Sequence, residues 1–211
     1  LFAQPLALPE RCRQLPIISI NRLDLWHRTT FTGDFNIGEL ELHSGQQYRF
    51  ESGATYSMDA LLATGDCGAS IDLSASESGM PANLVSTNAL TTEFTSLRDL
   101  AASGSGSFTA NEVIDQGGNS GWTLNDRVTS SLFWIGGTGN WNDPAHWATS
   151  SGGTSNGCLP SLADDVFFDA NSFTAAGQTV TINVENAGCR NMSWAGATFN
   201  PSFSGPEENR M

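Results

Sequence analysis

The sequence contains no lysine. All nine basic residues are arginine, and with 22 acidic residues the formal net charge is −13. A surface with this charge repels the phosphate groups of nucleic acids and of anionic lipids, so neither is expected as a partner. Charged residues make up only 15% of the chain, against about 25% in an ordinary soluble domain.

Long apolar runs are also missing. No stretch approaches the roughly 18 apolar residues that a membrane-spanning helix needs, so no membrane span is predicted. The chain opens with LFAQPLALPERCRQLPIISI, which has prolines and arginines where a signal peptide would have its apolar core. This opening, together with the final GPEENRM, suggests a segment of a longer protein.

Motifs that carry catalysis are absent. There is no GxSxG elbow, P-loop, HExxH or strand-to-helix GxGxxG. The four cysteines form no CxxC pair, and the three histidines have no zinc-site spacing. We therefore predict that the chain is not an enzyme. The alternative, a β-helical polysaccharide-active enzyme, would need carboxylates clustered with arginine or lysine on one face.

Apolar residues recur with a period of two along most of the chain. This alternation is typical of short strands with one buried face, and it appears in ELELH, QQYRFES, TYSMDALLAT, SIDLSA, DDVFFDA and QTVTINV. Only Thr95–Ala102, TSLRDLAA, is compatible with a helical turn or two. The sequence therefore predicts an all-β protein.

Glycine- and serine-rich corners separate these short strands. Closely spaced short strands favour β-solenoid modules resembling a right-handed parallel β-helix, and tandem β-sandwich modules are the alternative. We divide the chain into a loosely assigned N-terminal segment, 1–30, a β-repeat module, 31–127, and a tryptophan-motif module, 128–211, that leads into a further repeat.

Three of the six tryptophans fall within WIGGTGNWNDPAHW, residues 134–147. The glycines and the Asn-Asp-Pro run predict a loop, and tryptophan offers a large apolar area where regular structure is thin. We expect Trp134, Trp141 and Trp147 to pin this loop so that it caps or links solenoid modules. The alternative is that the same side chains form a platform for glycans.

The cysteines are Cys12, Cys67, Cys158 and Cys189. We predict a Cys158–Cys189 disulfide, because these two residues border the strands expected at Val166–Phe168 and Val180–Val184. The pairing of Cys12 and Cys67 stays open. Structural disulfides are typical of an oxidising, extracellular setting.

Acidic residues cluster in ADDVFFDAN. Asp164, Asp165 and Asp169, together with Asn171, offer oxygen ligands of the kind that Ca²⁺ takes. Ca²⁺ is the one cofactor that the sequence suggests, and the alternative is that these are solvated acids beside a strand.

Two long segments resemble a known family. The segment from Gly33 to Trp122 contains GDFNIGELELHSGQQYRFESGATYSMDALLATGDCGASIDLSA and LRDLAASGSGSFTANEVIDQGGNSGW. It resembles a repeat of very large extracellular proteins of gliding-type bacteria, which are exported by the type IX secretion pathway and described as surface adhesins or gliding-associated proteins. Trp134 to Gly205, with its GNWNDPAHW motif, is similar to the module that follows in those proteins. The resemblance implies β-helical or sandwich-like stalks without catalytic residues.

The function that we expect is a structural, non-catalytic repeat segment of a large secreted bacterial adhesin or extracellular fibre that mediates attachment or surface motility. Its partners would be neighbouring repeats of the same long chain, surface glycans, or other copies in a fibre. The alternative is a carbohydrate-binding module that uses exposed aromatics such as Trp26 or Trp122.

Overall fold

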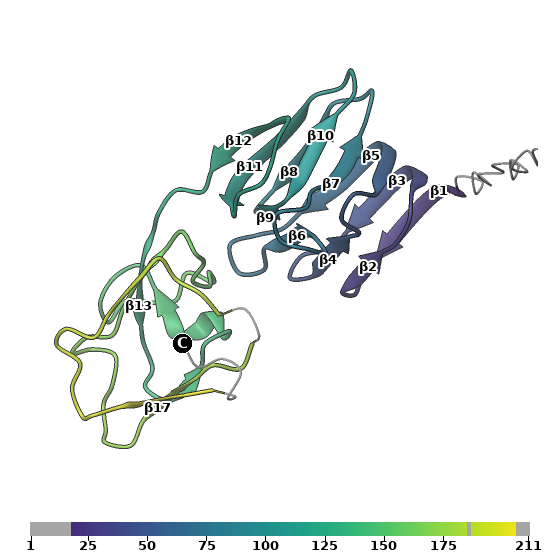
Figure 1. Ribbon diagram of the computed structural model, residues 1–211. Coiled ribbons are helices and arrows are strands. Elements are labelled where there is room, and N and C mark those ends of the chain that lie inside the picture. Colours follow the sequence, from purple (N-terminus) through teal and green to yellow (C-terminus); the bar gives the residue numbers. More distant parts are fainter. Residues whose placement is uncertain (1–17, 185–186, 206–211) are drawn as a thin grey trace, which may run out of the picture.

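Strands account for nearly all regular structure in the computed structural model, which describes residues 18–184 and 187–205 (Figure 1). The one helical element in these ranges is the 3₁₀ turn η1 (Pro144–His146). The prediction of an all-β protein is therefore confirmed. Within the same ranges no helix has the length and apolarity that a membrane crossing requires.

The first module, residues 18–126, is a single sheet of twelve strands. Its strands are β1 (Ile18–Leu25), β2 (Thr29–Phe31), β3 (Phe35–Leu42), β4 (Gln47–Phe50), β5 (Thr55–Thr64), β6 (Ile71–Ala75), β7 (Ala82–Val85), β8 (Leu90–Glu93), β9 (Thr95–Arg98), β10 (Leu100–Ser103), β11 (Phe108–Asp115) and β12 (Trp122–Asp126). β1 lies within the N-terminal segment that the sequence left loosely assigned, and it pairs with β3 along its length.

Each strand of this sheet pairs in parallel with a strand from the next turn of the chain. Ile18 lies opposite Phe35, and Phe35 lies opposite Tyr56. One ladder runs β1-β3-β5-β8-β11 and a second runs β2-β4-β6-β9-β11, so that β11 belongs to both (Figure 1). This mostly parallel arrangement is compatible with the predicted solenoid.

The side chains that alternate inward along both ladders form one apolar core. Its largest fully buried members in this module are Tyr48, Phe50, Tyr56, Ile37, Leu40, Ile71, Leu73 and Leu84. Burial raises the pKa of Tyr56 to about 12. The residues that alternate with a period of two are therefore the buried ones, as the sequence pattern predicts.

The helical turn predicted for Thr95–Ala102 is wrong. β9 and β10 occupy this segment, and Asp99 between them has a positive φ of 55°. The Asp99 carboxylate accepts a hydrogen bond from the Gly79 backbone N–H at 2.9 Å. This contact holds the corner between two strands where the local sequence suggested a helix.

The second module, residues 131–204, has shorter strands. They are β13 (Ser131–Trp134), β14 (Gly139–Asn140), β15 (Trp147–Ala148), β16 (Asp165–Phe167), β17 (Thr179–Thr181), β18 (Asn191–Ser193) and β19 (Ser202–Ser204). They form two parallel ladders, β13-β16-β18 and β14-β17-β19, with β15 antiparallel to β13. This module has a hydrophobic cluster of its own, which shares no residue with the core of the first.

Candidate functional site

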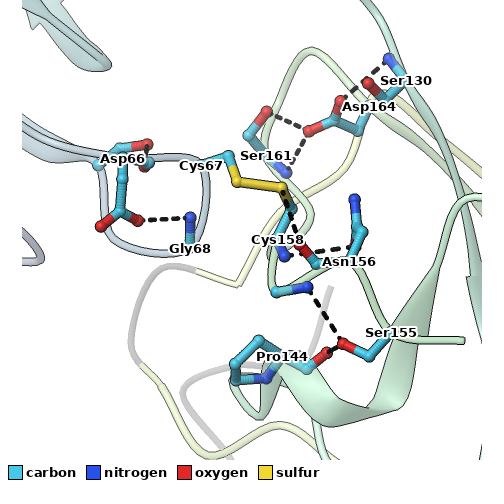
Figure 2. The surroundings of a disulfide bond; sticks show 12 residues. Asp66, Cys67, Gly68, Ser130, Pro144, Ser155, Asn156, Cys158, Ser161 and Asp164 are labelled. Atoms are coloured by element: carbon cyan, nitrogen blue, oxygen red, sulfur yellow. Dashed lines mark hydrogen bonds between the residues drawn. A yellow bond between two sulfur atoms is a disulfide. The ribbon is translucent and has the colours of Figure 1, made fainter.

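The two modules are joined by a disulfide bond between Cys67 and Cys158, whose Cα atoms are 4.8 Å apart (Figure 2). Cys67 lies in the turn after β5, and Cys158 lies in the loop after β15. Next to the bond, the Leu159 backbone N–H donates a hydrogen bond to the Cys67 carbonyl at 3.1 Å. The junction therefore links chain segments separated by 91 residues.

Tight turns on both sides of the junction present these cysteines. The Asp66 carboxylate accepts a hydrogen bond from Gly68 N–H at 2.8 Å, and Asp66 forms an antiparallel bridge with Ala69 (Figure 2). A Cβ at Gly68 would lie 2.7 Å from the Gly157 carbonyl oxygen. The two turns approach so closely that only glycine fits at position 68.

The loop that carries Cys158 is braced from within the second module. Ser155 donates a hydrogen bond to the Pro144 carbonyl at 2.6 Å and accepts one from Gly157 N–H at 3.1 Å (Figure 2). The Asn156 side-chain carbonyl accepts from Cys158 N–H at 3.3 Å. These contacts turn Cys158 toward the first module.

The predicted Cys158–Cys189 disulfide is wrong. Cys189 is a free thiol, half-buried against the apolar cluster of the second module. That burial, with a smaller contribution from the charge of Asp165, raises the pKa of the Cys189 thiol. The partner of Cys158 is Cys67, and Cys12 lies outside the described residues.

The predicted Ca²⁺ ligands do not come together. Asp164 is fully buried and accepts hydrogen bonds from the backbone N–H of Ser130 at 3.1 Å and of Ser161 at 2.9 Å, and from the Ser161 hydroxyl at 2.5 Å (Figure 2). Arg127 lies on the same carboxylate, with 3.8 Å between Nη2 and Oδ2. Asp164 is thus saturated by protein donors and braces the junction.

Asp165 and Asp169 have other partners. Arg190 binds Asp165 through two hydrogen bonds of 2.9 and 2.6 Å, and these bonds lower the pKa of Asp165. Asp169 accepts from the Asn171 backbone N–H at 2.9 Å, and the Asn171 amide group donates to Ser151 at 2.8 Å. Asp165 at the start of β16 and Asp169 in the turn after it therefore bind different protein groups, and the binding of Ca²⁺ to these residues stays a prediction.

The one group of three metal-ligand side chains whose ligand atoms lie within 4.8 Å in the described part of the chain is Asp24, Glu41 and His43. His43 Nε2 is 2.7 Å from an Asp24 oxygen, and Arg22 holds Glu41 at 2.5 Å. Because Arg22 brings a positive charge to this group, it opposes a cation there.

The three tryptophans predicted to pin the loop lie in the core of the second module. Trp134 and Trp147 are fully buried and Trp141 is 3% exposed. Two of their indole N–H groups donate hydrogen bonds to nearby carbonyl groups. Trp134 donates to Gly137 O at 2.7 Å, and Trp147 donates to Trp141 O at 2.8 Å. None of the three offers a ring face to a glycan.

A cleft of about 900 Å³ lies beside the disulfide, between the two modules. Its wall from the first module is the outer face of β4, β6 and β9, and its other wall comes from loops of the second module. Four of the chain's nine arginines and a single acidic residue line it: Arg28, Arg49, Arg98, Arg127 and Asp72.

Arg127 contacts both modules at this junction and was not among the site residues predicted from the sequence. Besides Asp164, it contacts the first module, with Nη1 3.5 Å from the Ser70 hydroxyl and the guanidinium 5.7 Å from the centre of the Phe94 ring. Arg127 therefore holds a buried carboxylate of one module and a turn of the other. No local motif distinguishes it from the other arginines.

Asp72 lies among the remaining arginines of the cleft. Burial raises the pKa of its carboxyl group, although the charges of Arg98, Arg49 and Arg28 act in the opposite direction. Partial burial therefore disfavours the charged form of Asp72 despite the three arginines around it.

Comparison with known proteins gives no relative: no family model, no curated protein and no solved structure matches the chain.

Proposed function

We propose that the chain is a structural, non-catalytic segment of a large secreted bacterial surface protein, in which two β-solenoid modules are locked end to end. The observation that carries this proposal is the Cys67–Cys158 disulfide, which crosslinks two separately packed parallel stacks at their junction. In an extended protein under tension, such a bond carries force between the modules without loading the linker at residues 127–130.

The ladders themselves support a place within a longer array. Stacked repeats gain stability from their neighbours, and an uncovered edge strand invites pairing. Trp194, which follows edge strand β18, is 36% exposed, and Phe203 within edge strand β19 is 41% exposed. These are apolar surfaces that a neighbouring repeat of the same long chain would cover.

The crosslink also supports an extracellular location, because disulfides persist in oxidising compartments. A bond that closes a loop of 91 residues contributes roughly 4–5 kcal/mol in the chain-entropy model. A secreted structural protein, which no chaperone can refold outside the cell, benefits from such a constraint.

Single-molecule stretching between the two ends of the chain tests the proposal. While the disulfide is intact, the 91-residue separation between its cysteines cannot extend. Reduction should add about 30 nm to the unfolded contour length. A Cys189→Ser control should stretch like the unmodified chain. Equal extension before and after reduction would show that no crosslink carries force, and the proposal would fail.

Glycan binding is a second candidate, favoured by one observation. Trp26 is 63% exposed and stacks through one face on His43, with 3.5 Å between ring centres. The opposite ring face is thus open to a sugar. Replacing Trp26 with alanine should remove binding on a glycan array if this face is the site, and unchanged binding would exclude it.

A further inference from the structure

Positive charge gathers in the junction cleft although the chain as a whole carries −13. Arg127 lies against Asp164, and Arg98 forms an ion pair of 3.9 Å with Asp99, which is outside the cleft lining. Arg49 and Arg98 also share the one carboxylate of the cleft lining, Asp72. The floor of the cleft is therefore net positive. A concave site of one charge sign concentrates ligands of the opposite sign.

The arginines stand in register on the outer face of the sheet. Arg49 on β4 lies opposite Ser74 on β6, and Ser74 lies opposite Arg98 on β9. Side chains in such a row project from the same face, with the outer two strands about 10 Å apart. Two long guanidinium side chains at this spacing can converge on a single group above the serine.

One donor in this row lacks a hydrogen-bond acceptor. Arg98 Nε is the one buried side-chain nitrogen or oxygen without a hydrogen-bond partner in the described part of the chain. Its nearest carboxylate oxygen, on Asp99, is 3.9 Å away, beyond hydrogen-bond reach. A buried unsatisfied donor costs stability. Because the Arg98 side chain is 33% exposed and lines the cleft, an acceptor in the cleft would favour a rotation of the guanidinium that gives this donor a partner.

The facing wall is of a different kind. It is mainly apolar and comes from the second module, with Leu159, Pro160, Leu162 and Val184. A ligand that suits both walls carries an oxyanion on one side and an apolar ring face on the other. A sugar unit with a carboxylate meets both requirements, and the cleft volume is ample for it.

We propose that this cleft binds a carboxylate-bearing sugar unit of an acidic polysaccharide, with Arg49 and Arg98 donating to the carboxylate. This binding function goes beyond the structural role proposed above and does not depend on it. The chain would then both span distance outside the cell and hold a matrix polymer at the junction between its modules.

Titration calorimetry with the oxidised chain at about 0.15 M salt, where long-range repulsion is screened, tests the proposal. The probe is an oligogalacturonate, and its methyl ester is the matched neutral ligand. We expect the acid to bind at least tenfold more tightly than the ester. Equal affinity of the two, or no binding of the acid at millimolar concentration, would overturn the proposal.

Variants locate the site. Arg98→Gln and Arg49→Gln should each weaken binding of the acid about tenfold to a hundredfold, the range for losing a charge-assisted hydrogen bond. Arg22→Gln removes the same charge from an exposed ion pair on β1 and β3 and should bind like the unmodified chain. Circular dichroism melts check folding, and Arg49→Gln serves if Arg98→Gln does not fold. Arginine variants that bind normally would overturn the proposal.

Two further variants distinguish binding in the cleft from binding elsewhere on the chain. Asp72→Asn removes the competing negative charge and should bind the acid about fivefold more tightly, a gain that a purely structural role does not predict. Trp26→Ala should bind normally, since its ring lies outside the cleft. Inorganic sulfate that competes as well as the free uronate monomer would reduce the site to a simple anion site and overturn its assignment to sugars.

Discussion

The two modules reach stability by different routes. In the first, β3 and β11 have eight residues and β5 has ten, so long parallel ladders supply many backbone hydrogen bonds. In the second, no described strand exceeds four residues, and β14 and β15 have two each. Short ladders bury little area, so the second module depends on larger side chains.

The cores show this compensation. The first is built mostly from leucine, isoleucine, alanine and single-ring aromatics that alternate along strands. The second centres on Trp134, Trp141 and Trp147, with 5.1 and 4.9 Å between neighbouring ring centres. Indole rings in edge-to-face contact add to the area they bury. Where turns replace strands, a few bulky residues therefore provide most of the packing.

Loss of the disulfide that joins the two modules should cost the most stability. The Cys67→Ser, Cys158→Ser double variant should lose roughly 4–5 kcal/mol of unfolding free energy by the loop-entropy model. Urea unfolding, followed by tryptophan fluorescence and by circular dichroism, should then separate into two transitions, with the second module unfolding first. Cys189→Ser is the matched control. A single unchanged transition in the double variant would mean that the modules hold together without the bond.

Removing an indole tests the compensation itself. Trp134→Ala should cost about 3–5 kcal/mol and unfold the second module, because the ring is fully buried. Leu73→Ala in the first module is the counterpart and should cost about 2–5 kcal/mol, distributed over long ladders that keep their hydrogen bonds. Hydrogen exchange locates each loss. Protection lost across both modules in either variant would contradict separate cores.

The next effect concerns Arg127. Arg127→Gln leaves Asp164, which is fully buried, without its cation, and we expect a loss of about 1–3 kcal/mol. Asp164 keeps its serine donors, which limits the damage. Arg190→Gln, which breaks an exposed pair with Asp165, is the comparison and should cost less. Chemical denaturation of both variants decides the order.

The smallest effects are in pH dependence, where the modules should differ in sign. The raised pKa of Asp72 favours folding as pH falls from neutrality toward 3.8. The lowered pKa of Asp165 contributes stability above 3.8 that is lost as pH falls through its folded value. In Asp72→Asn, folding stability should therefore no longer rise as the pH falls from neutrality to 3.8. In Asp165→Asn, it should no longer fall below pH 3.8 through loss of this carboxylate's interactions. Melting curves from pH 3 to 7 check both signs, and like signs would contradict the assignment.

Local pattern was enough to predict the strands and the buried face. Alternation placed Leu40, Tyr48 and Leu73 inside, and glycine-rich spacing indicated loops around buried tryptophans. The local pattern failed at Thr95–Ala102. Asp99 has a positive φ there and contacts Gly79, which belongs to another turn of the chain. A short apolar stretch does not reveal such a corner.

The junction depended on contacts that no local pattern contains. Cys189 is nearer to Cys158 in sequence than Cys67 is, yet the Asn156–Leu159 turn faces the first module. Likewise Arg49 and Arg98 become neighbours only through the parallel register across β6. Pairing between distant segments sets both features, so spacing along the chain could not predict them.

Peptide mapping under non-reducing conditions is the most direct test of the crosslinked junction. Free thiols are alkylated in the folded, oxidised chain before digestion. We predict a peptide pair joined through Cys67 and Cys158, and a Cys189 peptide that carries the alkyl label. A peptide pair joined through Cys158 and Cys189, or an alkylated Cys67, would contradict the crosslinked junction.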